Sequence, residues 1–261
     1  MQPSVSLAPL SRRRVILVAA TTAALASAAG ASYVVVSTRR PIAVSLDGVA
    51  VEEAVAREQA RTCQPPLVID GDPGRPLLEA KTALASARGL PPAAALRAEL
   101  AVLRTAVEYP ACRPTLLGLA YASAMMKMAE EAIRATWTAP ELTATDRAAA
   151  AAELATVDAA EPAIERIIEA EADWALVGLA PALRGEAAPP MWQYSKQEVA
   201  MRVRDVLRTR ARLRAACPAG RALVACADAL ADRTDLGSYT PVLRRYVEGV
   251  ARLDALRADL R

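Results

Sequence analysis

Hydrophobic side chains recur at spacings of three and four residues along most of the chain beyond residue 41. In the clearest example Leu96, Leu100, Leu103 and Val107 follow one another at intervals of 4, 3 and 4, which places them on one face of an α-helix. No segment alternates regularly between apolar and polar residues, as a half-buried β-strand does. The pattern therefore predicts an all-α fold, a multi-helix bundle of about eight helices.

Prolines, glycines and capping residues set the expected helix boundaries. The predicted helices cover residues 47–62, 77–88, 91–109, 114–137, 141–179 with a bend or break at Pro162, 195–216, 221–231 and 240–261. Capping boxes are expected at Thr138–Glu141 and Ser195–Glu198. Residues 181–194 contain three prolines and a glycine, so the region 41–261 is expected to have a linker there and could divide at that point. Helix pairs separated by prolines are also compatible with stacking of a helical-repeat type.

The predicted helix over residues 114–137 is apolar around most of its circumference. Its polar side chains share one narrow face, which carries Ser123, Lys127, Glu130, Glu131 and Arg134. A helix of this kind is buried on several sides, so we expect it at the centre of the bundle. Met125, Met126 and Met128 point in different directions around this helix, which favours core packing over a soft-metal site.

An uncharged run covers residues 15–36, with three arginines before it and two after it. It is just long enough to cross the hydrocarbon core as a helix, which takes about 20 mostly apolar residues. It also fits a cleaved secretory signal, with residues 12–14 as the basic region, 15–25 as the apolar region and 26–28 or 29–31 as the cleavage site. Residues 11–17 resemble a twin-arginine export signal, although the Phe and the Lys of that pattern are absent.

Both interpretations make residues 1–40 a basic flank with a signal-anchor or signal peptide, and they place residues 41–261 outside the cytoplasm. The expected location is the cell membrane, with a single pass and the body on the extracytoplasmic side. The alternatives are a secreted or periplasmic protein after cleavage, and an Ala-rich leader on a cytoplasmic protein. Small residues four apart, at 26 and 30 and at 27 and 31, fit helix dimerisation, so a homo-oligomer is retained as a partner hypothesis.

The composition of the 261-residue chain supports a helical core, because 54% of the residues are hydrophobic. There is no Phe and aromatic residues make up 3%, so the core must be built from Leu, Val, Ile, Ala and Met. Frequent Ala and the preference for Arg over Lys indicate a GC-rich bacterial genome. The formal net charge is +3, and it falls to −2 when the five arginines flanking the apolar run are left out. A nearly neutral body argues against a nucleic-acid partner.

The chain contains four cysteines and no histidine. No C-x-x-C pair occurs, so neither the cysteines nor histidine provide a zinc site, and no metal is expected. In an oxidising compartment the four cysteines predict two disulfides, for which three pairings exist. We favour Cys63–Cys112 and Cys217–Cys226; the alternative is four buried free thiols in a cytoplasmic protein.

The absence of histidine also excludes Ser-His-Asp and Cys-His catalysis, and no Gly-rich phosphate loop or cofactor motif occurs. Any enzyme chemistry is left with carboxylates, lysines and hydroxyls, so a protein that is not an enzyme is favoured. The first candidate for a catalytic carboxylate is Glu171, which projects into the apolar stripe formed by Ile164, Ile167 and Ile168. Burial there demands either an arginine partner or a raised pKa, and we favour a structural Glu–Arg pair. By contrast, the acidic residues at 161, 165, 169 and 173 are expected to form a solvated face.

A ladder with i, i+4 spacing is formed by Arg204, Arg208 and Arg212, and a parallel ladder by Arg210 and Arg214. Residues 196–214 carry seven basic and two acidic groups, whereas residues 146–173 carry two basic and eight acidic groups. The two helices are expected to face and neutralise each other. Alternatively, Arg204, Arg208 and Arg212 are a candidate binding surface for anionic lipid headgroups or an acidic partner.

Together these features predict an exported or membrane-anchored bacterial helical-bundle protein that acts as a binding or scaffolding component of the cell envelope. Its expected partner is a protein of the envelope or the anionic membrane surface. One alternative is a histidine-free enzyme that acts on envelope polymers through carboxylates, and another is a bundle that binds a small ligand. A cleft that joins Glu171 to a second carboxylate about 5–10 Å away would favour the enzyme. An apolar surface patch over a filled core would favour the interaction protein.

A reporter enzyme fused to the C-terminus, of a kind that works only after export, is expected to be active in cells that make the full chain, because the apolar run directs the body out of the cytosol. A fusion that works only inside the cell would contradict this prediction. The intact mass of the native protein then separates the two exported forms, since a mass lacking the first ~30 residues identifies a cleaved signal.

Overall fold

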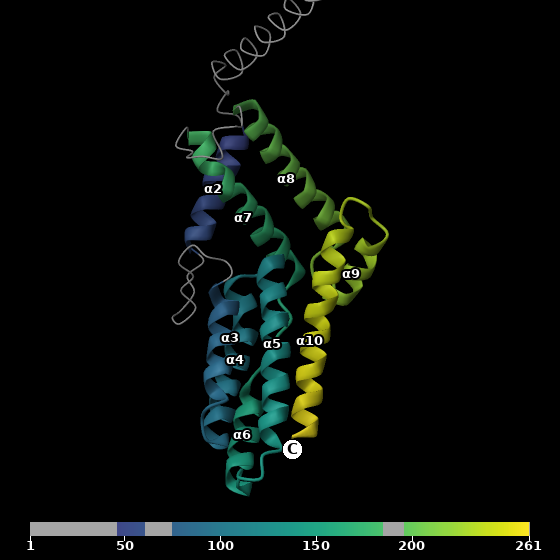
Figure 1. Cartoon of the computed structure of the whole chain (residues 1–261). Coiled ribbons are helices and arrows are strands. Elements are labelled where there is room, and N and C mark those ends of the chain that lie inside the picture. Colours follow the sequence, from purple (N-terminus) through teal and green to yellow (C-terminus); the bar gives the residue numbers. More distant parts are fainter. Residues whose placement is uncertain (1–45, 61–74, 185–195, 261) are drawn as a thin grey trace, which may run out of the picture.

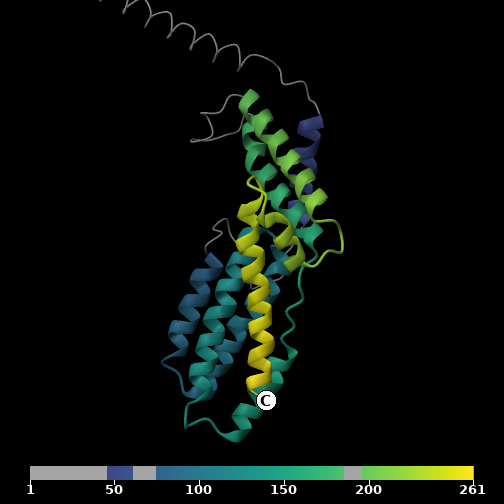
Figure 2. The same cartoon turned by 90° about the vertical axis from the view of Figure 1, so that its right-hand side faces the viewer.

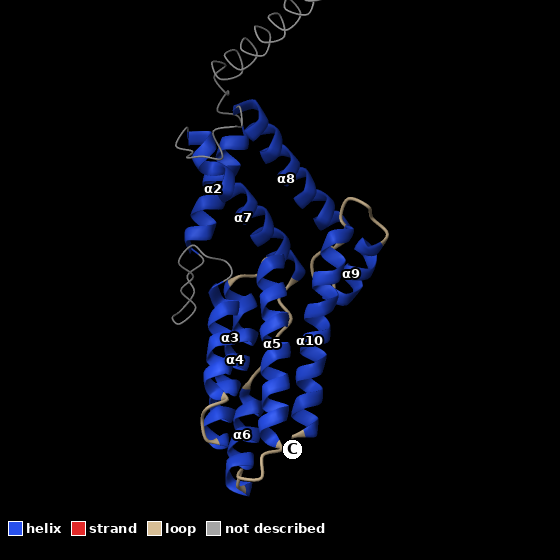
Figure 3. Ribbon diagram, viewed as in Figure 1, coloured by secondary structure: helices blue, strands red, loops and turns tan. Residues whose placement is uncertain are grey.

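A computed structural model of the chain describes residues 46–60, 75–184 and 196–260 (Figures 1 and 3). Within these ranges the fold is all-α, without a β-strand, as the sequence predicts. The elements are α2 (Leu46–Ala60), α3 (Arg75–Ala87), α4 (Pro92–Cys112), α5 (Leu116–Trp137), α6 (Ala144–Thr156), α7 (Ile164–Arg184), α8 (Lys196–Ala216), α9 (Leu223–Ala231), the 3₁₀-helix η2 (Gly237–Tyr239) and α10 (Thr240–Asp259).

The helices form two groups along the length of the molecule (Figures 1 and 2). The larger group contains α3, α4, α5, α6 and α10, which lie alongside one another, and α5 packs against α3, α4 and α10. The smaller group contains α2, α7 and α8, and α2 packs mainly against α7. The short elements α9 and η2 connect α8 to α10 and pack against α10. The chain passes between the two groups through α7 and α8: α7 follows α6 of the larger group, and α8 leads through α9 and η2 to α10.

The larger hydrophobic core surrounds α5, which confirms the predicted central position of this helix. Leu119, Met125 and Ile133 of α5 have at most 1% of their surface exposed, and Met126 is also buried. Gly249 of α10 allows a close approach here, because a Cβ atom at that position would lie 2.8 Å from Cε of Met126. The methionines of α5 thus fill space between helices, as their angular spread predicts.

A second hydrophobic core holds the smaller group of helices together. It is built from Val51 and Ala54 of α2, Leu176 and Ala180 of α7, and Val203 of α8. The beginning of α7 and the end of α8 instead contribute Ile167, Leu213 and other residues to the larger core. Each of these two helices therefore contributes to both cores, one at each end.

The expectation of a solvated acidic face is corrected for Glu169 and Asp173 of α7, whereas Glu161, which precedes α7, is exposed as expected. Asp173 has no exposed surface and accepts hydrogen bonds from Arg57 of α2, from Nη2 at 2.8 Å and from Nε at 3.1 Å. Glu169 is half-buried and pairs with Arg210 and Arg214 of α8. The four-residue spacing does place Glu169 and Asp173 on one face of α7, and basic side chains of α2 and α8 cover this part of the face.

Several helix boundaries differ from those that the prolines and capping residues predict. Pro181 lies inside α7, which continues to Arg184, whose guanidinium pairs with Glu52 of α2 at 2.6 Å. Tertiary contacts of this last turn offset the backbone hydrogen bond that proline removes. Similarly, α4 continues through Pro110 to Cys112.

The capping box before α6 lies five residues later than expected. Thr143 accepts a hydrogen bond from the backbone of Asp146, and the Asp146 carboxylate accepts one from the backbone of Thr143, so α6 begins at Ala144 rather than near Glu141. The expected break near Pro162 is present, because α6 ends at Thr156 and α7 begins at Ile164. At α5, Thr115 is the N-cap, one residue after Pro114. Threonine and aspartate form the same reciprocal cap as threonine and glutamate, which made the two boxes hard to separate from sequence.

One predicted disulfide lies within the described residues: Cys217 and Cys226 are bonded, with their Cα atoms 5.3 Å apart. Cys112 is also in a disulfide, and its predicted partner Cys63 lies outside the described residues. The same is true of the apolar run at 15–36, of Ser195 and of most of the predicted linker at 181–194. Within the described ranges, no helix combines the length and apolar character needed to span a bilayer.

Replacing Arg57 by Gln should lower the free energy of unfolding by on the order of 3 kcal/mol, because the Asp173 carboxylate has no exposed surface and would lose this cation. The matched control is Arg208→Gln on α8, whose exposed pair with Asp205 at 3.1 Å should contribute less than ~1 kcal/mol. Urea denaturation measures both variants, and hydrogen exchange should accelerate in α2 while α4 and α5 stay protected. Equal losses in the two variants would contradict a special role for the buried pair.

Candidate functional site

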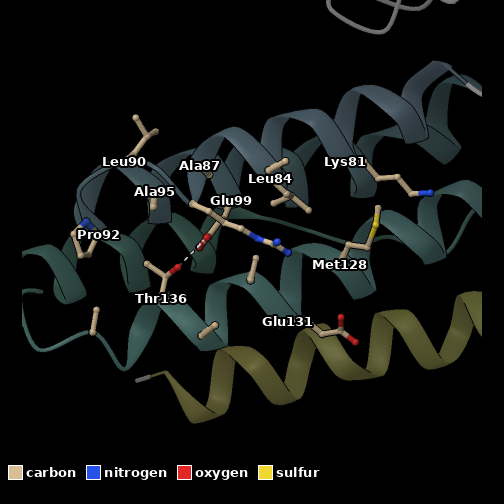
Figure 4. Close-up of a pocket in the computed structure, with 15 residues that line it drawn as sticks. Lys81, Leu84, Ala87, Leu90, Pro92, Ala95, Glu99, Met128, Glu131 and Thr136 are labelled. Atoms are coloured by element: carbon tan, nitrogen blue, oxygen red, sulfur yellow. Dashed lines mark hydrogen bonds between the residues drawn. The ribbon is translucent and has the colours of Figure 1, made fainter.

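A pocket with a volume of about 570 Å³ lies between α3, α4 and α5 (Figure 4). Its walls are mostly aliphatic: Leu84, Ala85, Ala87, Leu90, Pro92, Ala95, Met128, Ala132, Ala135 and Ala139. Its polar lining consists of Lys81, Arg88, Glu99, Glu131 and Thr136. An apolar pocket with a small number of polar groups is the usual form of a small-molecule site.

Glu99 of α4 is the buried polar group of this pocket. Only 3% of its surface is exposed, and its Oε1 accepts a hydrogen bond of 2.8 Å from the Thr136 hydroxyl of α5. Its Oε2 is also buried and has no hydrogen-bond partner among the described residues. Burial raises the pKa of the Glu99 carboxyl above its usual value, and the hydrogen bond from Thr136 lowers it by a smaller amount.

The position of Glu99 in the sequence explains why it is buried. It lies three residues after Leu96 and four before Leu103, so the helical repeat places it beside the apolar stripe of α4. Leu96 and Leu103 are each 1% exposed, so Glu99, which lies between them beside the same face, is buried as well. Sequence reasoning missed this residue, although the signal was the same one that singled out Glu171: a carboxylate within an apolar face.

The remaining charged groups of the pocket lie at its rim. Figure 4 shows Lys81 and Glu131 at the end of the pocket near Met128, with the Lys81 side chain pointing away from Glu99. Lys81, Arg88 and Glu131 are all exposed. The charges at the rim are therefore screened by water, whereas the carboxylate inside the pocket is not.

Glu171 lies where the two groups of helices meet, and it does not form the predicted ion pair. Its Oε2 accepts a hydrogen bond of 2.9 Å from the backbone N–H of Leu116, the first residue of α5, and no arginine within the described residues forms an ion pair with it. Glu171 thus caps the positive end of the α5 dipole from another helix. Burial raises the pKa of its carboxyl, and the Leu116 hydrogen bond opposes this shift.

The turn before α5 is tight enough to require glycine. A Cβ atom on Gly118 would overlap the carbonyl oxygen of Arg113, and the N–H of Gly118 is bonded to the Thr115 hydroxyl at 3.1 Å. This turn presents the N–H of Leu116 to α7. An arginine partner for Glu171 was predicted because the sequence gives no sign of a backbone donor from a distant turn.

Glu171 also lines a smaller pocket of about 220 Å³ between α7, α8 and η2. Asp205, Arg210 and Tyr239 share this pocket, and burial raises the pKa of the Tyr239 hydroxyl, with a further contribution from the nearby Glu171. Asp205 is exposed and pairs with Arg208 of its own helix. A second carboxylate is therefore present in the cleft, but its solvated environment differs little from that of an ordinary surface group.

The predicted arginine ladder is not the one that neutralises α7. Arg208 pairs with Asp205 at 3.1 Å and Arg212 with Asp235 at 3.0 Å, and both arginines are largely exposed. Arg204 is exposed as well. The parallel ladder of Arg210 and Arg214 instead reaches Glu169. The two oppositely charged helices thus do face each other, through the second ladder, and Arg204, Arg208 and Arg212 lie on the outer surface of α8.

The chain has no recognisable relative in the comparisons with known proteins. Protein-family models, curated protein sequences and solved structures all give no match. The class of protein is therefore defined by the fold alone, an all-α helical bundle, and the function must be argued from its pockets and charges.

The Glu171→Gln variant should become more stable relative to the parent protein as the pH rises. Because the pKa of Glu171 is raised in the fold, the parent loses stability as the pH rises through that pKa, whereas Gln stays neutral and keeps an acceptor for Leu116. We expect a melting temperature roughly 2–4 °C higher than that of the parent at pH 8, the shift that ~1 kcal/mol produces in a protein of this size. The difference should shrink by pH 4; a difference independent of pH would contradict the burial argument.

Proposed function

We propose that this protein is a binding component of the bacterial cell envelope, exported or anchored through residues 15–36, and that the pocket between α3, α4 and α5 is its binding site. The single observation that carries the choice of site is Glu99, a buried carboxylate with one oxygen left without a partner beside an aliphatic pocket. Such a group lowers the stability of the fold unless something binds to it.

The aliphatic lining supports binding rather than catalysis at this pocket. Glu131 is exposed at the rim, so Glu99 is the one carboxylate inside the pocket. Its Oε1 already accepts a hydrogen bond from the Thr136 hydroxyl. General acid–base hydrolysis needs two carboxyl groups that flank the scissile bond. A pocket with one buried acid and aliphatic walls instead suits recognition of an amphiphilic molecule.

The envelope location is supported by the sequence features at the N-terminus and by the cysteines. Disulfide bonds persist in oxidising compartments, and the described residues include the Cys217–Cys226 bond and a disulfide-bonded Cys112. A body held near a membrane would also place the exposed Arg204, Arg208 and Arg212 within reach of anionic headgroups or an acidic partner protein.

A carboxylate enzyme is the second candidate function, and the pocket shared by Glu171 and Asp205 favours it. The raised pKa of Glu171 is the property that a general acid needs. The hydrogen bond from Leu116 already occupies one of its oxygens, however, and Asp205 is solvated. We therefore place binding ahead of catalysis.

The neutral dye N-phenyl-1-naphthylamine should bind the purified protein in a one-to-one complex and gain fluorescence, because the aliphatic pocket can take up its rings. The double variant Ala132→Leu/Ala135→Leu fills the pocket from α5 and should weaken dye binding at least about tenfold, which is ~1.4 kcal/mol. Ala148→Leu, at an exposed position of α6, is the matched control and should bind like the parent. Equal dye binding by the parent and both variants would contradict the proposed site.

A further inference from the structure

We propose that the pocket between α3, α4 and α5 binds an organic ammonium ion carried on an aliphatic chain, with the ammonium group donating to Oε2 of Glu99 and the chain lying against the alanine and leucine walls. This inference rests on the proposed binding function and names the class of ligand. The evidence comes from three features of the pocket: the state of Glu99, the nature of the walls and the placement of the other charges.

The state of Glu99 calls for a hydrogen-bond donor. Oε1 is bonded to Thr136, whereas Oε2 is buried and has no partner in the part of the chain that the structure describes. Neither Lys81 nor Arg88, the cations that line the pocket, forms an ion pair with it within the described residues. The carboxylate therefore bears the cost of burial, and the Thr136 hydroxyl compensates for only part of it.

A cationic donor compensates for this burial better than a neutral one. A hydrogen bond between two charged groups is roughly twice as strong as one between neutral groups, and a nearby positive charge favours the ionised carboxylate. A carboxylate ligand has the opposite effect, because two negative charges would share one apolar site. Ammonium is therefore favoured over a hydroxyl group, and a hydroxyl group over a carboxylate.

The walls of the pocket set the remainder of the ligand. Alanines from all three helices, together with Leu84 and Met128, provide a surface without aromatic rings, so the pocket offers no stacking platform for a planar ligand. An aliphatic chain gains from the removal of its methylene groups from water, at about 0.8 kcal/mol for each one that is buried. The ligand class is accordingly an alkylammonium, whereas a neutral aromatic dye gains at the same walls only from the burial of its rings.

The other charges leave room for a cation at Glu99. Lys81 and Glu131 lie near Met128 at the rim (Figure 4), where Glu131 pairs with Lys127 at 3.9 Å. Arg88 is the remaining cation of the lining and is exposed. Oε2 is shielded from bulk water, so an entering ligand must displace part of the pocket lining to reach it. Arg88 is thus expected to oppose the ligand rather than help it.

Isothermal titration calorimetry on the full chain, with hexylammonium, hexanol and hexanoate as probes of equal chain length, tests this inference. Hexylammonium should bind most tightly, and Glu99→Gln should weaken its binding roughly tenfold or more, as expected for the loss of a charge-assisted hydrogen bond. The same substitution should change hexanol binding by less than about threefold. Glu131→Gln at the rim is the matched control and should change hexylammonium affinity only slightly.

Two further readouts separate a role in binding from a role in folding. Arg88→Gln should strengthen hexylammonium binding a few-fold, because it removes a like charge from the lining. Hexylammonium affinity should rise with pH over the range in which Glu99 loses its proton, in the parent and in Glu131→Gln, but not in Glu99→Gln. The charged groups that line the pocket are Lys81 of α3, Arg88 directly after α3, Glu99 of α4 and Glu131 of α5. These variants, together with Lys81→Gln, cover all four.

The outcomes also distinguish this inference from the proposed function. Tighter binding of hexanoate or hexanol than of hexylammonium, with dye binding intact, would overturn the ammonium assignment and leave the binding site standing. Hexylammonium binding that is unaffected by Glu99→Gln would overturn it as well. Loss of selective binding by every probe, including the dye, would instead remove the proposed function itself.

Discussion

The carboxylate of Asp173 has no exposed surface, and hydrogen bonds from Nε and Nη2 of Arg57 hold it between α7 and α2. The small core around it contains few large side chains, so the hydrophobic effect alone gives α2 limited support. The hydrogen bonds from Arg57 raise the pKa of its guanidinium further, which keeps the positive charge in place. One turn earlier, Glu169 binds Arg210 and Arg214 of α8. The acidic face of α7 therefore fixes a helix on each side of it, and the position of the whole smaller group follows from that arrangement.

The same helix also links the smaller group to the bundle. Glu171 lies between Glu169 and Asp173 in sequence but projects from another side of α7, where it caps the N-terminus of α5. The favourable interaction of a negative charge with the first turn of a helix is opposed by the cost of burying that charge. The raised pKa of Glu171 indicates that burial outweighs the cap. The junction between the two groups is consequently sensitive to pH.

Much of the fold could be predicted from the sequence because helical periodicity is a local property. The spacing of leucines in α4 and the apolar circumference of α5 predicted a helical bundle with α5 at its centre, and the structure confirms both. The environment of α7 could not be predicted, since a face of four acidic residues looks the same whether water or arginines cover it. The prediction that the helix ends before Pro181 was wrong for a related reason. The last turn of α7 carries the ion pair between Arg184 and Glu52, and these residues are far apart in the chain. The burial of Glu99 could have been predicted from the sequence, because Leu96 and Leu103 on either side of it mark the apolar face of α4.

The carboxylates of Asp173, Glu171 and Glu99 differ in which groups satisfy their hydrogen-bonding capacity. Asp173 has an arginine, Glu171 has a backbone N–H at a helix terminus, and Glu99 has one hydroxyl and a second oxygen without a partner. A structural role accounts for the first two, because each joins one helix to another through its hydrogen bonds. The hydrogen bond from Thr136 to Glu99 joins α4 and α5, which already pack closely along their length, so it adds little to the fold. A buried carboxylate that stabilises neither a helix end nor a junction, and that borders an aliphatic pocket, is best explained by a ligand that completes its hydrogen bonds.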